Sequence, residues 1–197
     1  EEPGSRQHLR LRRRAAEHYL RAGEREPGIR ALRDLLKTSG ITWPRSTAGT
    51  LGSLAMETLG RRVGIGPRSV DEEVLETLWS AGLGLALFDP MRAAAFQARH
   101  VRLAERARNP SHLSRALSTE GVLLAMRGGS AGKGAVDQLA RGRQLAEESG
   151  DPRARLHGTV MWAGYLFLVH EDRRVVGLTE QLDGLLREYR GAHWEWA

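Results

Sequence analysis

The feature that most constrains how this chain can fold is an internal repeat with a period of 42 residues. Residues 98–105 recur as residues 140–147, with Ala-Arg and Leu-Ala-Glu at matching places. Each copy is followed by a cap-and-proline pair, Asn109-Pro110 in one and Asp151-Pro152 in the other. A period of this length is typical of stacked helical units, because one helical pair cannot bury its apolar stripe alone.

The repeat divides most of the chain into three units, residues 67–108, 110–150 and 152–190, each predicted to be two antiparallel helices. In the first unit an apolar residue recurs at helical spacing from Val74 to Phe88. Ser69 with Glu72 matches a capping box at the start of that stripe. Asp89-Pro90, Asn109-Pro110 and Asp151-Pro152 each place a capping side chain before a proline at the first helical position. Asp172 is expected to cap the last helix.

Ahead of the repeats we expect a helical hairpin over residues 5–40, turning at Gly23. Residues 41–44 read as an extended connector, and a connecting helix covers residues 47–63. No long period-two alternation occurs, so no sheet is predicted. The expected fold is all-α: residues 1–197 as a single tetratricopeptide-like domain, a right-handed superhelix of nine or ten helices in stacked antiparallel hairpins.

Composition narrows the class of protein. The chain has no Cys, which excludes disulfides and thiolate metal sites. Its longest strongly apolar run, residues 159–169, is too short for a membrane span, which needs about 20 residues. Neither an initiator Met nor an apolar leader begins the sequence, so we expect a cytoplasmic piece of a larger protein. The positive charge is concentrated in residues 1–66, with 13 Lys and Arg against 7 Asp and Glu.

Several ordered blocks resemble one family. They are residues 79–85 (Trp-Ser-Ala-Gly-Leu-Gly-Leu), Asp89-Pro90, residues 95–99, residues 114–117, and residues 14–18 near the N-terminus. The chain is similar to the tetratricopeptide-like C-terminal region of large bacterial serine/threonine protein kinases that carry a signalling ATPase module of the STAND or AAA type. The resemblance spans nearly the whole chain. It implies ATP-binding kinase and ATPase domains upstream, and none of their motifs is in this sequence.

The function predicted on this basis is a non-catalytic protein-interaction or sensor segment for signal transduction. Its concave face would bind a protein or small effector, or other domains of the same chain, and neither a membrane nor a cofactor. The alternative parent is a large ATP-dependent transcription activator, in which the segment would sense an effector. A lesser alternative is binding of nucleic acid or an acidic partner through Arg10, Arg12, Arg13 and Arg14. Against it, these arginines wrap around the predicted helix, which favours a solvated surface or a contact with an upstream domain.

The sequence offers no catalytic, cofactor-binding or metal-binding residue, and it leaves the ligand-binding residues unknown. Residues 128–134 (Gly-Gly-Ser-Ala-Gly-Lys-Gly) lack the first Gly of a phosphate loop and its Ser/Thr, and they follow a helix, so we interpret them as a turn. The seven His residues include no paired metal-ligand motif, and His170 falls at a predicted turn. Trp79 and Trp162 are expected to pack between helices. Trp194 and Trp196 are expected to open a further helix.

Overall fold

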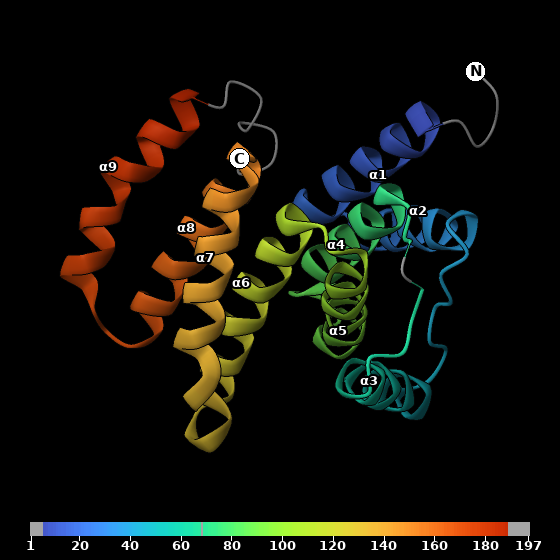
Figure 1. Cartoon of the computed structure of the whole chain (residues 1–197). Coiled ribbons are helices and arrows are strands. Elements are labelled where there is room, and N and C mark those ends of the chain that lie inside the picture. The colour runs from blue at the N-terminus through green and yellow to red at the C-terminus, as the bar shows by residue number, and fades with distance from the viewer. Residues whose placement is uncertain (1–5, 68, 189–197) are drawn as a thin grey trace. The chain divides into compact units, whose positions relative to one another are not determined.

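The structure is a computed structural model that describes residues 6–67 and 69–188, and this part of the chain is helical with no strand (Figure 1). The described elements are α1 (Arg6–Arg21), α2 (Arg25–Thr38), α3 (Thr47–Arg62), α4 (Glu72–Leu85), α5 (Pro90–Ala107), α6 (Pro110–Arg127), the 3₁₀ helix η1 (Gly129–Gly134), α7 (Ala135–Ser149), α8 (Pro152–Leu168) and α9 (Asp172–Glu188).

The elements follow the predicted plan. The hairpin of residues 5–40 is α1 and α2, and the connecting helix is α3. The three repeats correspond to the pairs α4/α5, α6/α7 and α8/α9, and the paired helices pack against each other. The all-α class is therefore confirmed, and the connector after Gly40 lies outside any helix.

Three of the predicted caps are confirmed and two are wrong. Oδ1 of Asn109 accepts a hydrogen bond from the His112 N–H at 3.0 Å, and Oδ1 of Asp151 accepts from the Arg153 N–H at 2.9 Å. Asp89 accepts from the N–H of Arg92 in the same manner. The cap of α4 is Asp71 rather than Ser69, because the side chain directly before the first helical residue reaches the free N–H of Glu73, at 3.0 Å. Asp172 is the first residue of α9, and the carbonyl of Glu171 before it accepts the first helical hydrogen bonds.

The chain divides into two compact units, and the boundary between them in the sequence falls between Ala107 and Arg108, close to the predicted boundary between the first two repeats. In the first unit α1 packs on α2 and on α4, α4 packs on α5, and α3 packs on α5 (Figure 1). Its core contains buried Leu, Phe and Ala side chains from α1, α2, α4 and α5, among them Leu36, Leu78 and Phe96.

The second unit packs α6 against both α7 and α8, and α8 against α9. The closest approach is between α6 and α7, where glycines let two backbones touch. A Cβ on Gly142 would meet Oγ of Ser118 at 2.4 Å and the carbonyl of Ser114 at 3.1 Å. Gly150 ends α7 in the left-handed conformation, at φ 64°, which suits glycine. Among the described residues no helix is long and apolar enough to cross a membrane.

Candidate interaction surface

Helix α3 is attached to the first unit by charged side chains. The carboxylate of Glu57, 8% exposed, accepts a hydrogen bond from Nε of Arg102 on α5 and lies 3.8 Å from Nε of Arg99. One turn further on, Nε and Nη2 of Arg61 lie 2.9 and 2.8 Å from Oε1 of Glu105. The contact between α3 and α5 therefore depends on ion pairs.

The loop after α3 extends this charged contact. Nη1 of Arg102 donates to the Ile65 carbonyl at 2.7 Å, and Nη2 of Arg106 donates to the Gly66 carbonyl at 3.3 Å. Two glycines lie close to the side chain of Arg102. A Cβ on Gly60 would lie 3.1 Å from Cδ of Arg102, and one on Gly66, whose φ is 148°, would lie 2.7 Å from its Nη1.

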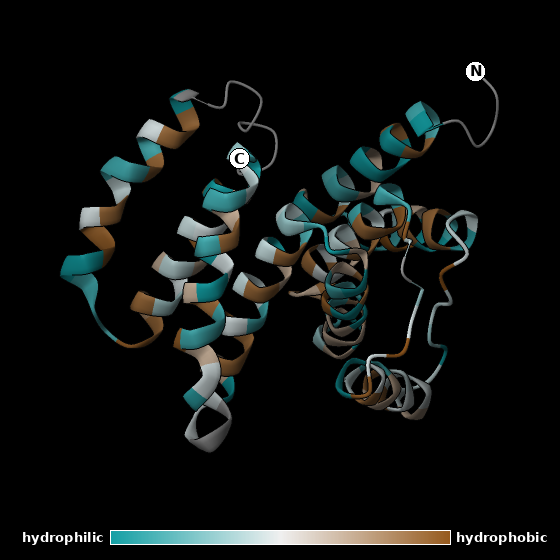
Figure 2. Cartoon of the chain, in the orientation of Figure 1, coloured by the Kyte–Doolittle hydropathy of each residue, from teal (hydrophilic) through white to brown (hydrophobic). Residues whose placement is uncertain are grey.

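The opposite face of α3 and the loop after it are apolar and open to solvent. Leu51, Leu59 and Val63 follow one another at multiples of four residues, so they lie along one side of the helix. Their exposed fractions are 49%, 56% and 57%, and those of Met56 and Ile65 are 68% and 65%. We call these five residues the α3 face. Figure 2 shows α3 mostly in pale and brown shades, which mark its low polarity.

This arrangement reverses the usual amphipathic helix, which turns its apolar stripe to the core and its charges to water. Here Thr50 and Glu57 are the buried residues of α3, while Leu51, Met56 and Leu59 are exposed and Leu54 is half-buried. Single exposed apolar residues are ordinary on protein surfaces, but a contiguous apolar patch marks a place where another molecule binds. The α3 face is therefore the candidate site of the first unit.

Sequence reasoning missed this site although the signal was present. The spacing of Leu51, Leu59 and Val63 shows an apolar stripe, and Glu57 lies on the other side of the same helix. Which side faces the core depends on Arg99 and Arg102, more than 40 residues later in the chain. Helix periodicity alone does not provide that information.

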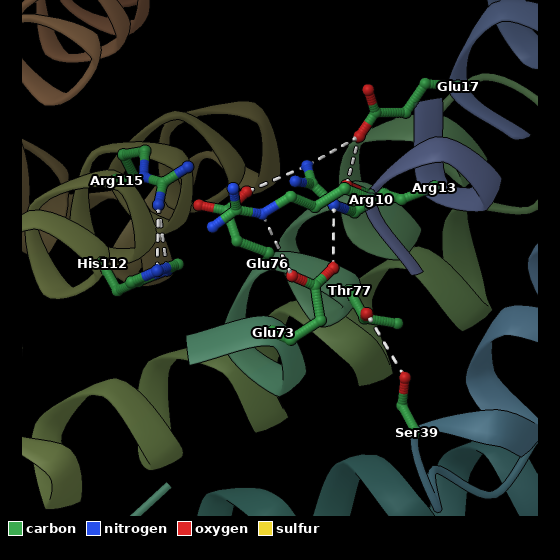
Figure 3. Close-up of polar contacts among 10 residues, drawn as sticks. Arg10, Arg13, Glu17, Ser39, Glu73, Glu76, Thr77, His112 and Arg115 are labelled. Atoms are coloured by element: carbon green, nitrogen blue, oxygen red, sulfur yellow. Dashed lines mark hydrogen bonds and ion pairs between the residues drawn. The ribbon is translucent and has the colours of Figure 1, made fainter. Parts of the chain in front are cut away.

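The four arginines singled out near the N-terminus differ in their exposure to solvent. Arg13 is 8% exposed and lies between α1 and α4, with its guanidinium nitrogens 3.4 Å from Glu73, 3.0 Å from Glu76 and 3.4 Å from Glu17 (Figure 3). Arg10 lies at the edge of this group, 4.0 Å from Glu73. Arg13 therefore belongs to an ionic contact between helices, whereas Arg12 and Arg14 are exposed.

The other residues singled out in the sequence do not assemble into one site. Trp79 is buried in α4 at 4% exposed, as expected. Trp162 is half-buried, with its ring 5.9 Å from that of Tyr165 and 5.4 Å from the guanidinium of Arg143. Gly128 follows α6 and residues 129–134 form η1, which connects α6 to α7, so the interhelical turn is confirmed. His170 lies in the turn between α8 and α9. Trp194 and Trp196 fall outside the described residues.

A buried polar group lies in the core of the second unit. Arg115, His112 and His157 are each 2% exposed or less. Nη2 of Arg115 lies 3.0 Å from Nδ1 of His112 (Figure 3), and Oγ1 of Thr119 lies 2.9 Å from Nε2 of His157. Burial, with a further contribution from the charge of Arg115, lowers the pKa of His157 to about 3. His157 is therefore a neutral core residue at neutral pH, and no three His, Cys, Asp or Glu side chains of the described chain gather closely enough to hold a metal ion.

Comparison with known proteins adds no assignment: no family model, no curated protein and no solved structure matches this chain.

Proposed function

We propose that this chain is a non-catalytic interaction segment whose α3 face docks a helix of a protein partner. The observation that carries the proposal is the reversed orientation of α3, which buries Glu57 against α5 and leaves five large apolar side chains in water. A helix held by ion pairs keeps its apolar side available. Docking of an amphipathic helix on an apolar surface is a recurring mode of peptide recognition.

The charges around the α3 face define the partner's chemistry. Between residues 45 and 66 the only acidic residue is Glu57, which is buried, while Arg45 and Arg62 are exposed. A second copy of this chain would therefore bring arginine against arginine. The complementary partner is a helix with an apolar stripe and acidic residues beside it, because opposite charges across an interface select the partner and speed association.

The family resemblance supports a parent for this segment: a bacterial cytoplasmic serine/threonine kinase with a signalling ATPase module. In that setting the hairpins would continue as a right-handed superhelix, and docking would be passed to the catalytic domains. The alternative parent, a large ATP-dependent transcription activator, has the same need for an interaction segment. Reading the gene on both sides of the chain distinguishes them, since only the kinase parent carries a kinase domain followed by an ATPase upstream.

Binding of nucleic acid through the arginines of α1 ranks below docking. Arg13 is engaged by Glu17, Glu73 and Glu76, which leaves three arginines of the predicted four toward solvent. No groove-reading element accompanies them. The same cluster is the place where an acidic partner was expected, and the docking proposal moves that partner to α3.

The test uses two labelled peptides about 20 residues long, so that each spans the length of α3 as a helix. Both carry the same stripe of Leu and Ala at helical spacing, flanked by Glu in one peptide and by Lys in the other. Fluorescence anisotropy measures their binding to the full chain. We expect the Glu-flanked peptide to bind at least about tenfold more tightly, because only it complements Arg45 and Arg62.

Two matched variants locate the binding. L51Q/L59Q/V63Q removes three apolar side chains of the α3 face. L87Q/M126Q/V176Q removes three apolar side chains elsewhere that are more exposed still. The first should reduce binding by at least about tenfold and the second by less than about twofold. Equal binding of the two peptides, or equal loss in the two variants, would contradict the proposal.

A further inference from the structure

A concave site lies in the first unit, between the C-terminal end of α2 and the connector that leads to α3. It is a cavity of about 730 Å³, within the size range of small-molecule sites. Ile41 and Trp43 contribute apolar surface, and Arg33, Asp34, Lys37 and Arg45 contribute charge. We call it the α2 groove.

Acidic residues of the described chain do not neutralise the charge of the α2 groove. Arg33, Lys37 and Arg45 are exposed, and none of them has an ion-pair partner in the described part of the chain. The single acidic residue of the lining is Asp34, so the groove has a net charge near +2. Arg33 and Lys37 are four residues apart on one helix face, where like charges repel. Arg13 of α1 and Arg102 of α5, in contrast, are paired with glutamates, Arg13 with Glu73 and Glu76 and Arg102 with Glu57.

Trp43 forms part of the wall of the α2 groove, and two arginines lie over its indole ring. The guanidinium carbon of Arg33 lies 4.6 Å from the centre of the Trp43 ring, and that of Arg92 lies 5.3 Å from it. Nε of Arg92 also donates to the Pro44 carbonyl at 2.8 Å, which holds the connector beside Trp43. Because Arg33 and Arg92 already lie over the Trp43 ring, we expect the groove to bind a ligand through its charged groups and not by stacking on the indole.

We propose that the α2 groove binds a phosphate monoester through Arg33, Lys37 and Arg45. A phosphate monoester carries about −1.5 to −2 charges at neutral pH, which matches the net charge of the groove, whereas a single carboxylate leaves it positive. The guanidinium groups of Arg33 and Arg45 can each present two N–H groups to phosphate oxygens, and Lys37 adds a compact charge. This proposal rests on different observations from docking at α3, and Arg45 is a residue that both proposals use.

Two backbone N–H groups in the lining of the α2 groove are not available to a bound ligand. The N–H groups of Gly40 and Ile41 already donate to carbonyls of α2, at 3.1 and 2.8 Å. The helix end also directs its carbonyls toward this region, and these disfavour an anion. We therefore expect most of the affinity to come from the three cationic side chains.

Phosphorylated side chains and small phosphorylated metabolites share this chemistry, and the probes separate them. Isothermal titration calorimetry at low ionic strength compares a capped pentapeptide with a central phosphoserine, the same peptide with Glu in that position, and a sugar phosphate. We expect at least one phosphorylated probe to bind about tenfold or more tightly than the Glu peptide. The one that binds identifies the source. Equal affinity for the Glu peptide, or no binding of either phosphorylated probe at millimolar concentration, overturns the proposal.

Matched variants separate a site from general attraction to a basic protein. R33Q/K37Q/R45Q removes the groove cations, and R12Q/R14Q/R25Q removes three exposed arginines elsewhere, so both lower the net charge equally. We expect the first to abolish measurable binding and the second to keep affinity within about threefold. Equal weakening in both overturns the proposal. R45Q alone, which leaves the contact of Arg33 with Trp43 intact, gives the same test, with about tenfold weaker binding expected, if the triple variant does not fold.

Discussion

The carboxylate of Glu57 on α3 is buried against Nε of Arg102 on α5, and this ion pair holds a helix whose opposite side is apolar and open. A second pair, between Arg61 and Glu105, lies 2.8 Å apart one turn further along. Ion pairs are therefore a main part of the attachment of α3, whereas α1, α2, α4 and α5 share an apolar core.

Replacing Glu57 should release α3 from the first unit. In Glu57→Gln the guanidinium groups of Arg99 and Arg102 lose their carboxylate, at a cost of about 1–3 kcal/mol. Hydrogen exchange measured by mass spectrometry should speed up across α3 and stay unchanged in α4. Glu105→Gln is the control, because its pair is about a third exposed and should contribute less than about 1 kcal/mol. Unchanged exchange in α3 of Glu57→Gln would show that other contacts hold the helix.

Arg13 should contribute far more to stability than its neighbour. Arg13→Gln leaves Glu17, Glu73 and Glu76 close together with only Arg10 at the edge of the group, so we expect a loss of about 3 kcal/mol or more in the free energy of unfolding. Arg12→Gln changes an exposed side chain and should cost less than about 0.5 kcal/mol. Urea unfolding measures both. Similar values for the two variants would mean that the Arg13 group is not a stabilising contact.

Glycines in the second unit should respond oppositely to alanine. In Gly142→Ala the new methyl group collides with Ser118 and with the carbonyl of Ser114, and we expect about 1–3 kcal/mol of destabilisation. Gly164 in α8 has no atom within 4 Å of an added Cβ, so Gly164→Ala should stabilise by about 0.5–1 kcal/mol through helix propensity. Thermal unfolding compares them, and a stable Gly142→Ala variant would contradict the close packing of α6 on α7.

His157 should make the chain less stable in mild acid. Because its pKa is about 3 in the folded chain and 6.5 as a model value, the unfolded chain takes up the proton first as the pH falls. This contribution is complete above pH 6.5 and is lost progressively toward pH 3. The free energy of unfolding that is lost in this way between pH 7 and pH 5 is about 2 kcal/mol.

Urea unfolding at these two pH values should show a steeper loss in the native chain than in His157→Gln. The proton NMR signal of the His157 ring should also stay unshifted down to pH 5. A titration midpoint near 6.5 for that signal would refute the assignment of a neutral, buried ring.

Helix positions were predictable from the sequence because they depend on local signals. Caps such as Asn109 and Asp151 lie one residue before a proline, and both the pattern and the structure follow from the free N–H groups of a first helical turn. Where the cap was assigned wrongly, at Ser69, the sequence offered another acceptor, Asp71, nearer to the helix.

The environment of individual side chains was not predictable, because it is set by residues far away in the sequence. The run of arginines in α1 looks uniformly solvated until Glu73 and Glu76, about 60 residues later, lie opposite Arg13. The orientation of α3 likewise depends on arginines of α5. Both candidate surfaces, the α3 face and the α2 groove, arise from contacts between elements and not from a motif.

Site-specific thiol labelling tests most directly whether the α3 face is exposed and docks a helix. Because the chain has no Cys, each introduced Cys is the only thiol in its variant. Leu59→Cys reports on the α3 face, Val176→Cys on an exposed site in another helix, and Ala81→Cys on the core. In the free chain Leu59→Cys should react as fast as Val176→Cys and far faster than Ala81→Cys, and the Glu-flanked peptide should protect only Leu59→Cys. Slow labelling of Leu59→Cys in the free chain would show that the α3 face is covered. Labelling that the peptide leaves unchanged would show that the helix does not dock there.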